Sequence, residues 1–306
     1  MRRSTPLAFV LLLAACVPAP APVPPAAVVD GPPPDPGRYA GLPPDFVEML
    51  PGVEWAAVEA DGHLVWLYRP TGAGEDRSPR PLVVVPPAGS NLVTGMGLAD
   101  GDRPEHLPYV EAGFCVAAFA ISGAEPARLD DEAAYQRSMQ AFAASELGIA
   151  DARRAISVAM AHLPVDEERI VVAGHSSAGT LALQVAAVDD RVDEVVAFAP
   201  VTDLVANFGD NFAVIEREIP DLTAKLRAYS PLALVPRLDK PVFLFHARDD
   251  QVVLPQETEA LAAKLGYWAE RVEVDSGGHY DSMIVEGLPK AIDWIDSVGS
   301  REEANR

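Results

Sequence analysis

The sequence predicts an α/β fold in which a mostly parallel sheet is covered by helices on both faces. Short apolar runs recur along the chain at residues 82–85, 114–119, 170–173, 195–198 and 242–245. Segments with helical spacing of apolar residues separate several of these runs, at 149–163, 177–188 and 256–265, and another follows at 288–298. Continuous apolar runs are typical of strands buried on both faces, and strands that alternate with helices favour parallel pairing.

Three further segments complete this prediction. Residues 53–69 contain two extended stretches around Asp61-Gly62, a dipeptide typical of hairpin turns, so we expect an antiparallel hairpin at the start of the sheet. The partly polar run at 272–274 is typical of a strand near a sheet edge. Residues 202–230 interrupt the alternation, and we expect a short helical insertion above the strand ends. That insertion forms either a lid or pocket wall for the substrate or a purely structural crossover.

Composition places the protein among globular chains and excludes several function classes. Of the 306 residues, 49% are hydrophobic and 23% are charged, which is too apolar for a largely disordered chain. The net charge of −21 argues against nucleic-acid binding and against attraction to anionic lipid, because both require clustered Lys and Arg. Two cysteines cannot form a disulfide framework, and no residues have metal-ligand spacing, so we expect no metal. Cys115 lies inside an apolar run and is expected to be a small buried hydrophobe.

The first residues have the layout of an export signal. A basic start at residues 2–3 precedes a compact apolar run at 7–13, far shorter than the ~20 residues of a membrane-spanning helix. Small residues follow, and Leu13-Ala14-Ala15-Cys16 resembles a bacterial lipobox. That resemblance implies that residues 1–15 are a signal peptide and that Cys16 is lipidated as the mature N-terminus. The alternative is an ordinary cleaved signal with an incidental cysteine.

Proline dominates the segment that follows. Thirteen of the 29 prolines fall within the first 51 residues, with three in succession at 32–34. Proline donates no backbone hydrogen bond and biases its neighbours toward extended conformations, so residues 16–51 are expected to form a semi-rigid tether. We therefore expect one globular domain over residues 52–300, exported and held at a bacterial membrane, in the cell envelope or periplasm, by the N-terminal lipid.

The most informative segment is residues 170–179, where a β-branched strand leads into Gly-His-Ser-Ser-Ala-Gly and a helix begins at once. Such a strand–turn–helix puts one serine on a sharp, strained bend, with its hydroxyl exposed at the carboxyl end of the sheet. The strand and helix pass closely there, so the flanking positions must be small, as Gly174, Ala178 and Gly179 are. The alternative is a Gly/Ser-rich loop that merely ends a strand.

Ser176 is the better candidate for a nucleophile on this bend. It lies two residues after Gly174 and two before Ala178, whereas Ser177 has the bulky His175 two residues before it. The inner side of the bend tolerates side chains poorly, which favours Ser176 and leaves Ser177 as the alternative. His175 is a poor candidate for the base, because a residue adjacent in the turn cannot easily face its neighbour's hydroxyl.

A serine nucleophile needs a base to take its proton and a carboxylate to orient that base. The loop after the run at 242–245 contains two carboxylates, Asp249 and Asp250. The loop after 272–274 contains His279, and the two glycines before it predict a flexible, open loop in which the imidazole reaches the nucleophile. The chain order serine, aspartate, histidine is the one expected on a sheet of this type.

These segments resemble one known group of enzymes. From about residue 53 to residue 298, the chain is similar to α/β-hydrolases, in particular to the catalytic domains of dienelactone hydrolases and prolyl oligopeptidases. The nucleophile turn at 174–179, the approach to the acid strand at 229–232 and 239–242, and the loops at 246–250 and 278–279 carry the resemblance. It implies a catalytic α/β-hydrolase domain over residues 52–300.

The resemblance places the catalytic acid at Asp250, the fourth position after His246. Asp249 is then expected to be an exposed loop residue, and His246 to hold its own loop together. Asp203, which follows another predicted strand, is the alternative acid. The implied catalytic residues are thus Ser176, His279 and Asp250.

Hydrolysis through a tetrahedral intermediate also needs donors aimed at the oxyanion. We expect one to be the backbone N–H of Ser177, immediately after the nucleophile. The other is expected from the loop at 86–91, which follows the run at 82–85. The family's usual His-Gly appears there as Pro87-Ala88, so the donor is expected within residues 88–90, with Gly89 preferred.

The sequence thus predicts a serine hydrolase that requires no cofactor and hydrolyses a small-molecule ester. The related peptidases carry a large propeller, and the residues before Leu82 are too few to build one. A serine peptidase acting on short peptides, similar to prolyl oligopeptidase, is the alternative. A non-catalytic binding protein on the same fold is a second alternative, which the presence of serine, acid and histidine together makes less favoured.

The lipobox interpretation predicts lipid on Cys16. In a bacterial host, the wild-type protein and Cys115→Ala should be lipidated at the mature N-terminus, whereas Cys16→Ala should not, because only a thiol at this position accepts the lipid. Mass spectrometry of the N-terminal peptide measures this directly. An unmodified N-terminus at another residue of the wild-type protein contradicts the interpretation.

Overall fold

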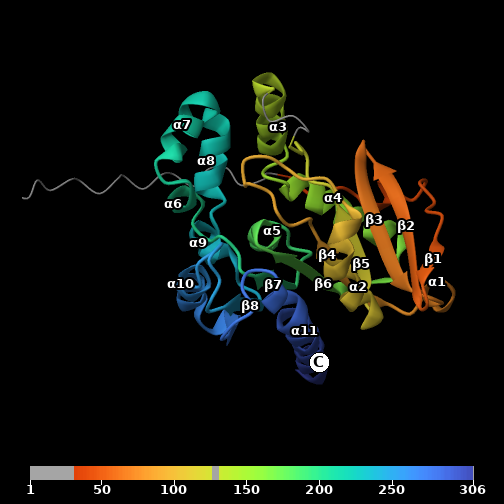
Figure 1. The fold of residues 1–306 in the computed structure, drawn as a ribbon. Helices are drawn as coiled ribbons and strands as arrows, with labels where there is room; N and C mark the ends of the chain where they lie inside the picture. Colours follow the sequence, from red (N-terminus) through yellow and green to blue (C-terminus); the bar gives the residue numbers. More distant parts are fainter. Residues whose placement is uncertain (1–30, 126–130, 306) are drawn as a thin grey trace, which may run out of the picture.

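A nine-stranded sheet forms the centre of the protein (Figure 1). The computed structural model describes residues 31–125 and 131–305, with side chains through residue 300. The strands lie in the order β1-β2-β3-β5-β4-β6-β7-β8-β9. Their bounds are β1 (Val47–Leu50), β2 (Val53–Ala60), β3 (His63–Pro70), β4 (Arg80–Val85), β5 (Cys115–Phe119), β6 (Val165–His175), β7 (Glu194–Phe198), β8 (Val242–Ala247) and β9 (Ala269–Val274).

Pairing in this sheet is antiparallel at one end and parallel elsewhere. The pairs β1–β2, β2–β3 and β3–β5 are antiparallel. The pairs that join β5, β4, β6, β7, β8 and β9 are all parallel. The predicted α/β fold, with a mostly parallel sheet that starts from a hairpin, is therefore confirmed.

Helices cover both faces of the sheet (Figure 1). On one face, α2 (Arg103–Glu111) and α11 (Leu288–Asn305) share a core with Val83 and Val85 of β4. On the other face, α4 (Ile149–His162), α5 (Ser177–Ala186) and α10 (Gln256–Leu265) share a core with Leu82 and Val84. Successive side chains of a strand point to opposite faces, so a strand buried on both faces has a continuous apolar sequence.

The remaining helical segments lie in the connections. They are α1 (Ala73–Asp76), α3 (Glu132–Ala144), α6 (Leu204–Phe208), α7 (Asn211–Glu218), α8 (Pro220–Ala228) and α9 (Pro231–Leu234), with the short segments η1 (Pro36–Arg38), η2 (Asp100–Asp102), η3 (Val235–Arg237), η4 (Gly266–Trp268) and η5 (Met283–Gly287).

The elements that were not predicted from the sequence include β1, α2 and α3. Helix α2 contains Pro108 in its interior and another proline in its first turn, and proline is atypical of helix interiors. Helix α3 buries only Phe142 and Ala143, so its apolar periodicity is weak. Strand β1 lies in the proline-rich segment. The strongly periodic segments agree well with the structure, since α10 has the predicted bounds and β9 lies at the sheet edge.

The expected tether over residues 16–51 is wrong in its second half. Strand β1 pairs with β2, and Tyr39 is 2% exposed within the core. The hydroxyl of Ser157 in α4 donates to the carbonyl of Pro34 (2.6 Å). Residues 31–51 therefore pack on the domain, because proline-rich composition predicts extended backbone but not whether that backbone finds a surface. The expected signal peptide, Cys16 and the rest of the expected tether lie outside the described residues.

Residues 202–230 form the expected helical insertion, in which α7 and α8 lie at the upper left of Figure 1. The N–H of Thr202 donates to the Glu257 carboxylate (2.8 Å), which ties the start of the insertion to α10. The ammonium of Lys225 in α8 donates to the carbonyl of Ala143 and to the carboxylate of Glu146, both at 2.8 Å. These contacts fix the insertion to the end of α3.

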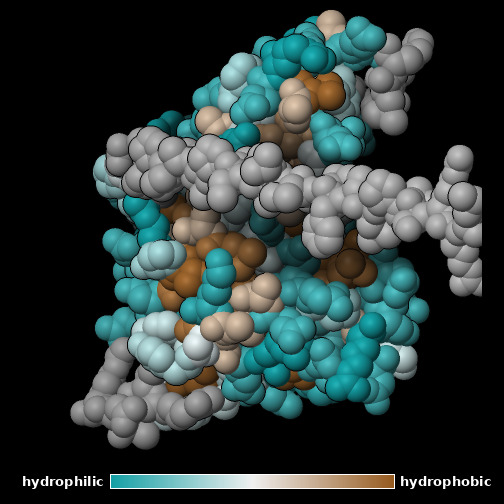
Figure 2. Space-filling model, turned by 90° about the vertical axis from the view of Figure 1, so that its left-hand side faces the viewer, coloured by the Kyte–Doolittle hydropathy of each residue, from teal (hydrophilic) through white to brown (hydrophobic). Residues whose placement is uncertain are grey.

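The surface is largely hydrophilic, consistent with the net charge of −21. On the face shown in Figure 2, hydrophilic side chains predominate, and apolar ones gather in separate groups between them. Within the described ranges, none of the helices combines the length and apolar character needed to cross a bilayer.

The connection from β6 to α5 is a very tight part of the fold. A Cβ added at Gly174 would lie 2.4 Å from the carbonyl carbon of Ala178 and 2.8 Å from its Cβ. A Cβ added at Gly179 would lie 2.9 Å from the carbonyl oxygen of Gly174. Strand and helix therefore touch backbone to backbone, and the predicted need for small residues at these positions is confirmed.

Substitution at Gly174 should destabilise the fold. In Gly174→Ala, the added methyl group collides with backbone rather than with a movable side chain, so the free energy of unfolding should fall by about 2–3 kcal/mol. In the control Gly41→Ala, the new Cβ meets no atom within 4 Å, and little change is expected. Urea denaturation of both variants measures the difference. Equal stability of the two variants would show that the close approach relaxes freely.

Candidate active site

Ser176 lies at the carboxyl end of β6, immediately before α5. Its backbone has φ 55° and ψ −120°, in the left-handed half of conformational space that non-glycine residues rarely adopt. Its N–H donates to the carbonyl of Phe198 in β7 (2.8 Å), and its carbonyl accepts the N–H of Thr180 (3.0 Å). The neighbouring strand and the helix thus hold this strained conformation, an arrangement that is frequent at functional turns. The side chain of Ser176 is half-buried.

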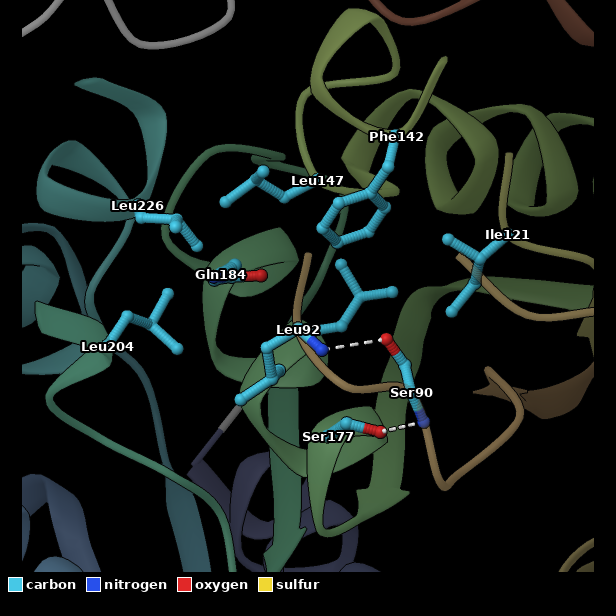
Figure 3. A pocket seen from close by; sticks show the side chains of 10 residues that line it. Ser90, Leu92, Ile121, Phe142, Leu147, Ser177, Gln184, Leu204 and Leu226 are labelled. Carbon is cyan, nitrogen blue, oxygen red and sulfur yellow. Dashed lines mark hydrogen bonds between the residues drawn. The ribbon is translucent and has the colours of Figure 1, made fainter. Parts of the chain in front are cut away.

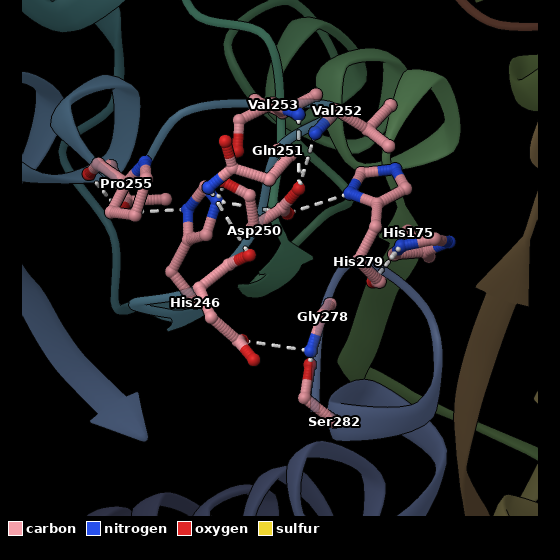
Figure 4. A network of polar contacts seen from close by, with 12 residues as sticks. His175, His246, Asp250, Gln251, Val252, Val253, Pro255, Gly278, His279 and Ser282 are labelled. Carbon is pink, nitrogen blue, oxygen red and sulfur yellow. Dashed lines mark hydrogen bonds and ion pairs between the residues drawn. The ribbon is translucent and has the colours of Figure 1, made fainter. Parts of the chain in front are cut away.

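His279 and Asp250 form a direct pair on the loops that follow β9 and β8 (Figure 4). The Nδ1–H of His279 donates to Oδ2 of Asp250 at 2.7 Å. The other carboxylate oxygen accepts the backbone N–H groups of Val252 (2.8 Å) and Val253 (3.1 Å). Asp250 is 1% exposed, whereas the side chain of His279 is 16% exposed. A buried carboxylate therefore orients a partly accessible imidazole.

Hydrogen bonding keeps Asp250 ionised despite its burial. Burial by itself raises the pKa of this carboxyl group, but the hydrogen bonds from His279 and from the backbone of Val252 and Val253 outweigh it. The pKa of Asp250 is consequently lower than its ordinary value of 3.8. At neutral pH the group is a carboxylate, the form needed to stabilise a protonated imidazole.

His246 holds the acid loop, as predicted. It is fully buried, with Nε2 at 2.9 Å from the carbonyl oxygen of Val253 and at 3.2 Å from Oδ2 of Asp250. Its Nδ1 lies 3.1 Å from the hydroxyl of Thr258 in α10. The ring thus connects the loop to the helix that follows it.

Asp249 has a role that the sequence did not reveal. Its side chain is exposed, as predicted, but its carboxylate accepts the backbone N–H groups of Gly277 (3.2 Å) and Gly278 (2.8 Å). The hydroxyl of Ser282 also donates to the carbonyl of Gly278 (2.7 Å). The histidine loop is therefore tied on both sides rather than open and flexible. Its glycines are required for backbone shape, since both have positive φ.

His175 links the histidine loop to the turn that carries Ser176. Its Nε2–H donates to the carbonyl of His279 (2.8 Å), and the two imidazole rings lie 4.5 Å apart. His175 is 4% exposed, and burial lowers its pKa to about 4, so the ring is neutral at pH 7. As predicted, it is not placed as a base for its neighbour, because its polar contact is with the backbone of His279. It instead brings His279 next to the turn.

The alternative residues are engaged elsewhere. The carboxylate of Asp203 caps α6 by accepting the N–H groups of Val205 (3.1 Å) and Ala206 (3.0 Å). The hydroxyl of Ser177 accepts the N–H groups of Gly89 (3.1 Å) and Ser90 (3.0 Å) and so faces the loop after β4. In the described part of the chain, Ser176 Oγ makes no hydrogen bond to His279, a contact that in many enzymes tightens only when substrate binds.

A narrow pocket opens beside Ser177 and Ser90 (Figure 3). Its cavity volume is about 10 Å³, and the space beside it opens to solvent. Apolar side chains from five regions of the chain form most of its walls: Leu92, Ile121, Phe142, Leu147, Leu181, Leu204 and Leu226. Leu204 and Leu226 come from the insertion at 202–230, so that segment forms a wall of the pocket.

Comparison with known families gives a direct match. The sequence pattern of the prolyl oligopeptidase family matches residues 127–286, more than half of the chain. The protein belongs to the prolyl oligopeptidase family. It is therefore a serine hydrolase, and the predicted α/β-hydrolase fold is confirmed. A search of curated proteins found no significant sequence match.

Solved structures with the same fold include both esterases and peptidases. Acetyl xylan esterase 1 from Thermoanaerobacterium sp. JW/SL YS485 is 19% identical, with a TM-score of 0.58 over 87% of this chain and 94% of its own. The propionate-bound esterase Est2 from Thermogutta terrifontis is 19% identical, with a TM-score of 0.59 over 82% and 96%. The acylaminoacyl peptidase of Pyrococcus horikoshii is 14% identical, with a TM-score of 0.58 over 83% of this chain but only 41% of the peptidase chain.

Cys115 takes no part in this site. Cys115 is fully buried, as predicted, and burial raises its pKa to about 12, so its thiol stays protonated. Among residues 31–125 and 131–300, no group of three or more His, Cys, Asp or Glu side chains is arranged to hold a metal ion.

Removing the charge of Asp250 should reduce turnover far more than substrate binding. In Asp250→Asn, the amide no longer stabilises a protonated His279, so kcat for an activated ester should fall roughly a thousandfold or more, with KM little changed. Steady-state kinetics at pH 7 measure this effect. A variant with wild-type kcat would show that Asp250 is not the orienting acid.

The difference in stability between the wild type and Asp250→Asn should depend on pH. Because the pKa of Asp250 is lowered by folding, its carboxylate stabilises the native state above pH 3.8, and this contribution disappears as the pH falls through the folded pKa. The difference in Tm between the wild type and Asp250→Asn should therefore shrink between pH 5 and pH 2.

Proposed function

We propose that this protein hydrolyses carboxylic esters with short acyl groups, using Ser176 as nucleophile, His279 as base and Asp250 as the orienting acid. The observation that carries this proposal is the 2.7 Å His279–Asp250 pair, tied through His175 to the turn on which Ser176 is strained. A buried carboxylate, an accessible imidazole and a serine at a sharp turn are the parts that acyl transfer needs.

In the proposed reaction, the oxygen of Ser176 attacks the ester carbonyl while its proton moves to Nε2 of His279. The carbonyl π electrons move to oxygen, and the tetrahedral intermediate then expels the alcohol, which takes its proton from His279. Asp250 stabilises the imidazolium formed in between, because its carboxylate stays ionised. Water then attacks the acyl-enzyme by the same steps, so that the acid is released and Ser176 is regenerated.

The backbone N–H of Ser177 is proposed as one donor to the oxyanion, because it follows the nucleophile directly at the start of α5. Gly89 was expected to supply the second donor. Its N–H instead donates to the hydroxyl of Ser177 (3.1 Å), so it does not face the oxyanion directly.

The pocket supports an ester with a small apolar acyl group. Its walls are mostly Leu, Ile and Phe side chains, and its small cavity suits a short acyl chain better than a peptide with polar backbone groups on both sides. Two structures that share the fold hold propionate and butyrate, and two others are acetyl xylan esterases. All of these names describe short acyl groups.

A serine peptidase that acts on short peptides is the second candidate. The family itself is named for an oligopeptidase, and another structure with this fold is an acylaminoacyl peptidase in complex with Z-Gly-Gly-Phe-chloromethyl ketone. The chain spans 41% of that peptidase.

We also propose that the protein acts at a bacterial membrane. The support is the order of basic start, apolar run and Leu13-Ala14-Ala15-Cys16, with proline-rich residues following. Lipid on Cys16 would hold the domain at the cell envelope without a membrane-spanning helix.

Labelling with a fluorophosphonate probe tests the nucleophile. The wild-type protein should be labelled, and Ser176→Ala should not be, because the probe reacts only with an activated serine. Persistent labelling of Ser176→Ala would identify another nucleophile, and absence of labelling in both would exclude the proposed mechanism.

Hydrolysis rates on matched substrates separate the two candidate functions. For p-nitrophenyl acetate and butyrate, kcat/KM of the wild-type protein should be at least tenfold higher than for p-nitrophenyl octanoate, since the pocket is small. Short peptide p-nitroanilides should be poorer still, and Ser176→Ala should be inactive on every substrate. A preference for the anilides would favour the peptidase.

A further inference from the structure

The hydroxyl of Ser177 is held in an unusual position for a residue that follows a nucleophile. Its Oγ accepts two backbone hydrogen bonds from the loop after β4, one from Ser90 at 3.0 Å (Figure 3) and one from Gly89 at 3.1 Å. A serine hydroxyl has two lone pairs and one hydrogen. Both lone pairs are thus occupied, and the hydrogen is the group that remains available to donate.

That hydrogen has no protein acceptor within the described residues. Ser177 is 6% exposed, and it lines the pocket in which the acyl group is proposed to bind. In the part of the chain that the structure describes, its hydroxyl donates no hydrogen bond. A nearly buried donor that faces a substrate pocket with no protein acceptor is suited to an acceptor on the substrate.

The loop that holds this hydroxyl has few other donors to offer. Pro86 and Pro87 have no N–H, so the donors nearest the end of β4 are Ala88, Gly89 and Ser90. Two of these three N–H groups are directed at Ser177 Oγ. Pro87-Ala88 stands where the resemblance to related hydrolases implies His-Gly. In this protein the Ser177 hydroxyl lies against the Gly89 and Ser90 donors of the loop, on the side of the candidate active site.

The loop is rigid enough to hold the hydroxyl in place. The side chain of Asn91 accepts the N–H groups of Val93 (3.0 Å) and Thr94 (2.9 Å), and the hydroxyl of Ser90 donates to the carbonyl of Thr94 (2.6 Å). Donors fixed before the reaction lose no free energy to reorganisation as charge develops. Accepting two hydrogen bonds also polarises a hydroxyl, which makes it a stronger donor.

We propose that the side-chain hydroxyl of Ser177 is a catalytic oxyanion donor that relays the backbone N–H groups of Gly89 and Ser90 to the substrate. This inference rests on the proposed role of Ser176. As Ser176 attacks and the carbonyl electrons move to oxygen, the oxyanion accepts two hydrogen bonds from Ser177, one from its N–H and one from its Oγ–H. These two groups are separated by only two carbon atoms, which allows both to reach one oxygen. No proton leaves Ser177.

Substitution of Ser177 distinguishes a hydroxyl that donates to the oxyanion from one that only occupies the N–H groups of Gly89 and Ser90. In Ser177→Ala, the donor is lost and kcat for p-nitrophenyl acetate should fall 10- to 100-fold, with KM changed less than about threefold, because the donor acts chiefly on the charge of the transition state. Ser177→Thr keeps a hydroxyl and should recover most of the activity. If Ser177→Ala is as active as the wild type or more active, the hydroxyl merely occupies the loop donors, and the proposal is overturned.

Two further measurements keep the result interpretable. Ser177→Cys is nearly isosteric and a weak donor, so it should fold normally and show an intermediate loss of kcat; wild-type kcat in this variant would also overturn the proposal. The rate of fluorophosphonate labelling should fall in parallel with kcat in the Ser177 variants, whereas Ser176→Ala should not be labelled. Labelling of Ser176→Ala, or of no protein, would refute the proposed function and the Ser177 role with it. Normal labelling with unchanged Ser177→Ala kinetics would refute the Ser177 role alone.

Discussion

The site depends on one steric constraint, the close approach of β6 and α5. Backbone atoms of Gly174 and Ala178 leave no room for a side chain between strand and helix. The chain must therefore reverse within a very short turn, and Ser176 takes the positive φ that this reversal requires. The conformational strain is offset by hydrogen bonds to β7 and within α5, which together fix the serine at the carboxyl end of the sheet.

Parallel pairing of β8 and β9 brings the remaining polar groups to the same edge. The two strands are adjacent in the sheet, so their following loops emerge side by side. Consecutive carboxylates then have different functions: Asp250 holds the imidazole of His279, and Asp249 holds the backbone that precedes it. His246 fixes the loop after β8, and His175 contacts the loop after β9 from the turn that carries Ser176. The imidazole is thus positioned by two other segments of the chain, the end of β8 with its loop and the end of β6.

The loop after β4 begins with Pro86 and Pro87, which shapes the donors available at the site. Two prolines remove donors that a loop of this kind would otherwise present, and the hydroxyl of Ser177 lies against the donors that remain. The same residue faces the apolar pocket, whose far wall is formed by the insertion at 202–230. The proposed sites of oxyanion stabilisation and acyl binding are therefore adjacent, and both involve the first turn of α5.

Local sequence determined the fold class, the strand–turn–helix around Ser176 and the loops that carry Asp250 and His279. These features depend on apolar periodicity, small residues at tight approaches and polar residues at strand ends, all of which are visible over short stretches. Tertiary structure decided the packing of residues 31–51, the helices α2 and α3, and the parts played by Asp249, His175 and the Ser177 hydroxyl. Each of these depends on contacts between segments far apart in the chain, as between Ser177 and Gly89, and residue type alone does not specify such a partner.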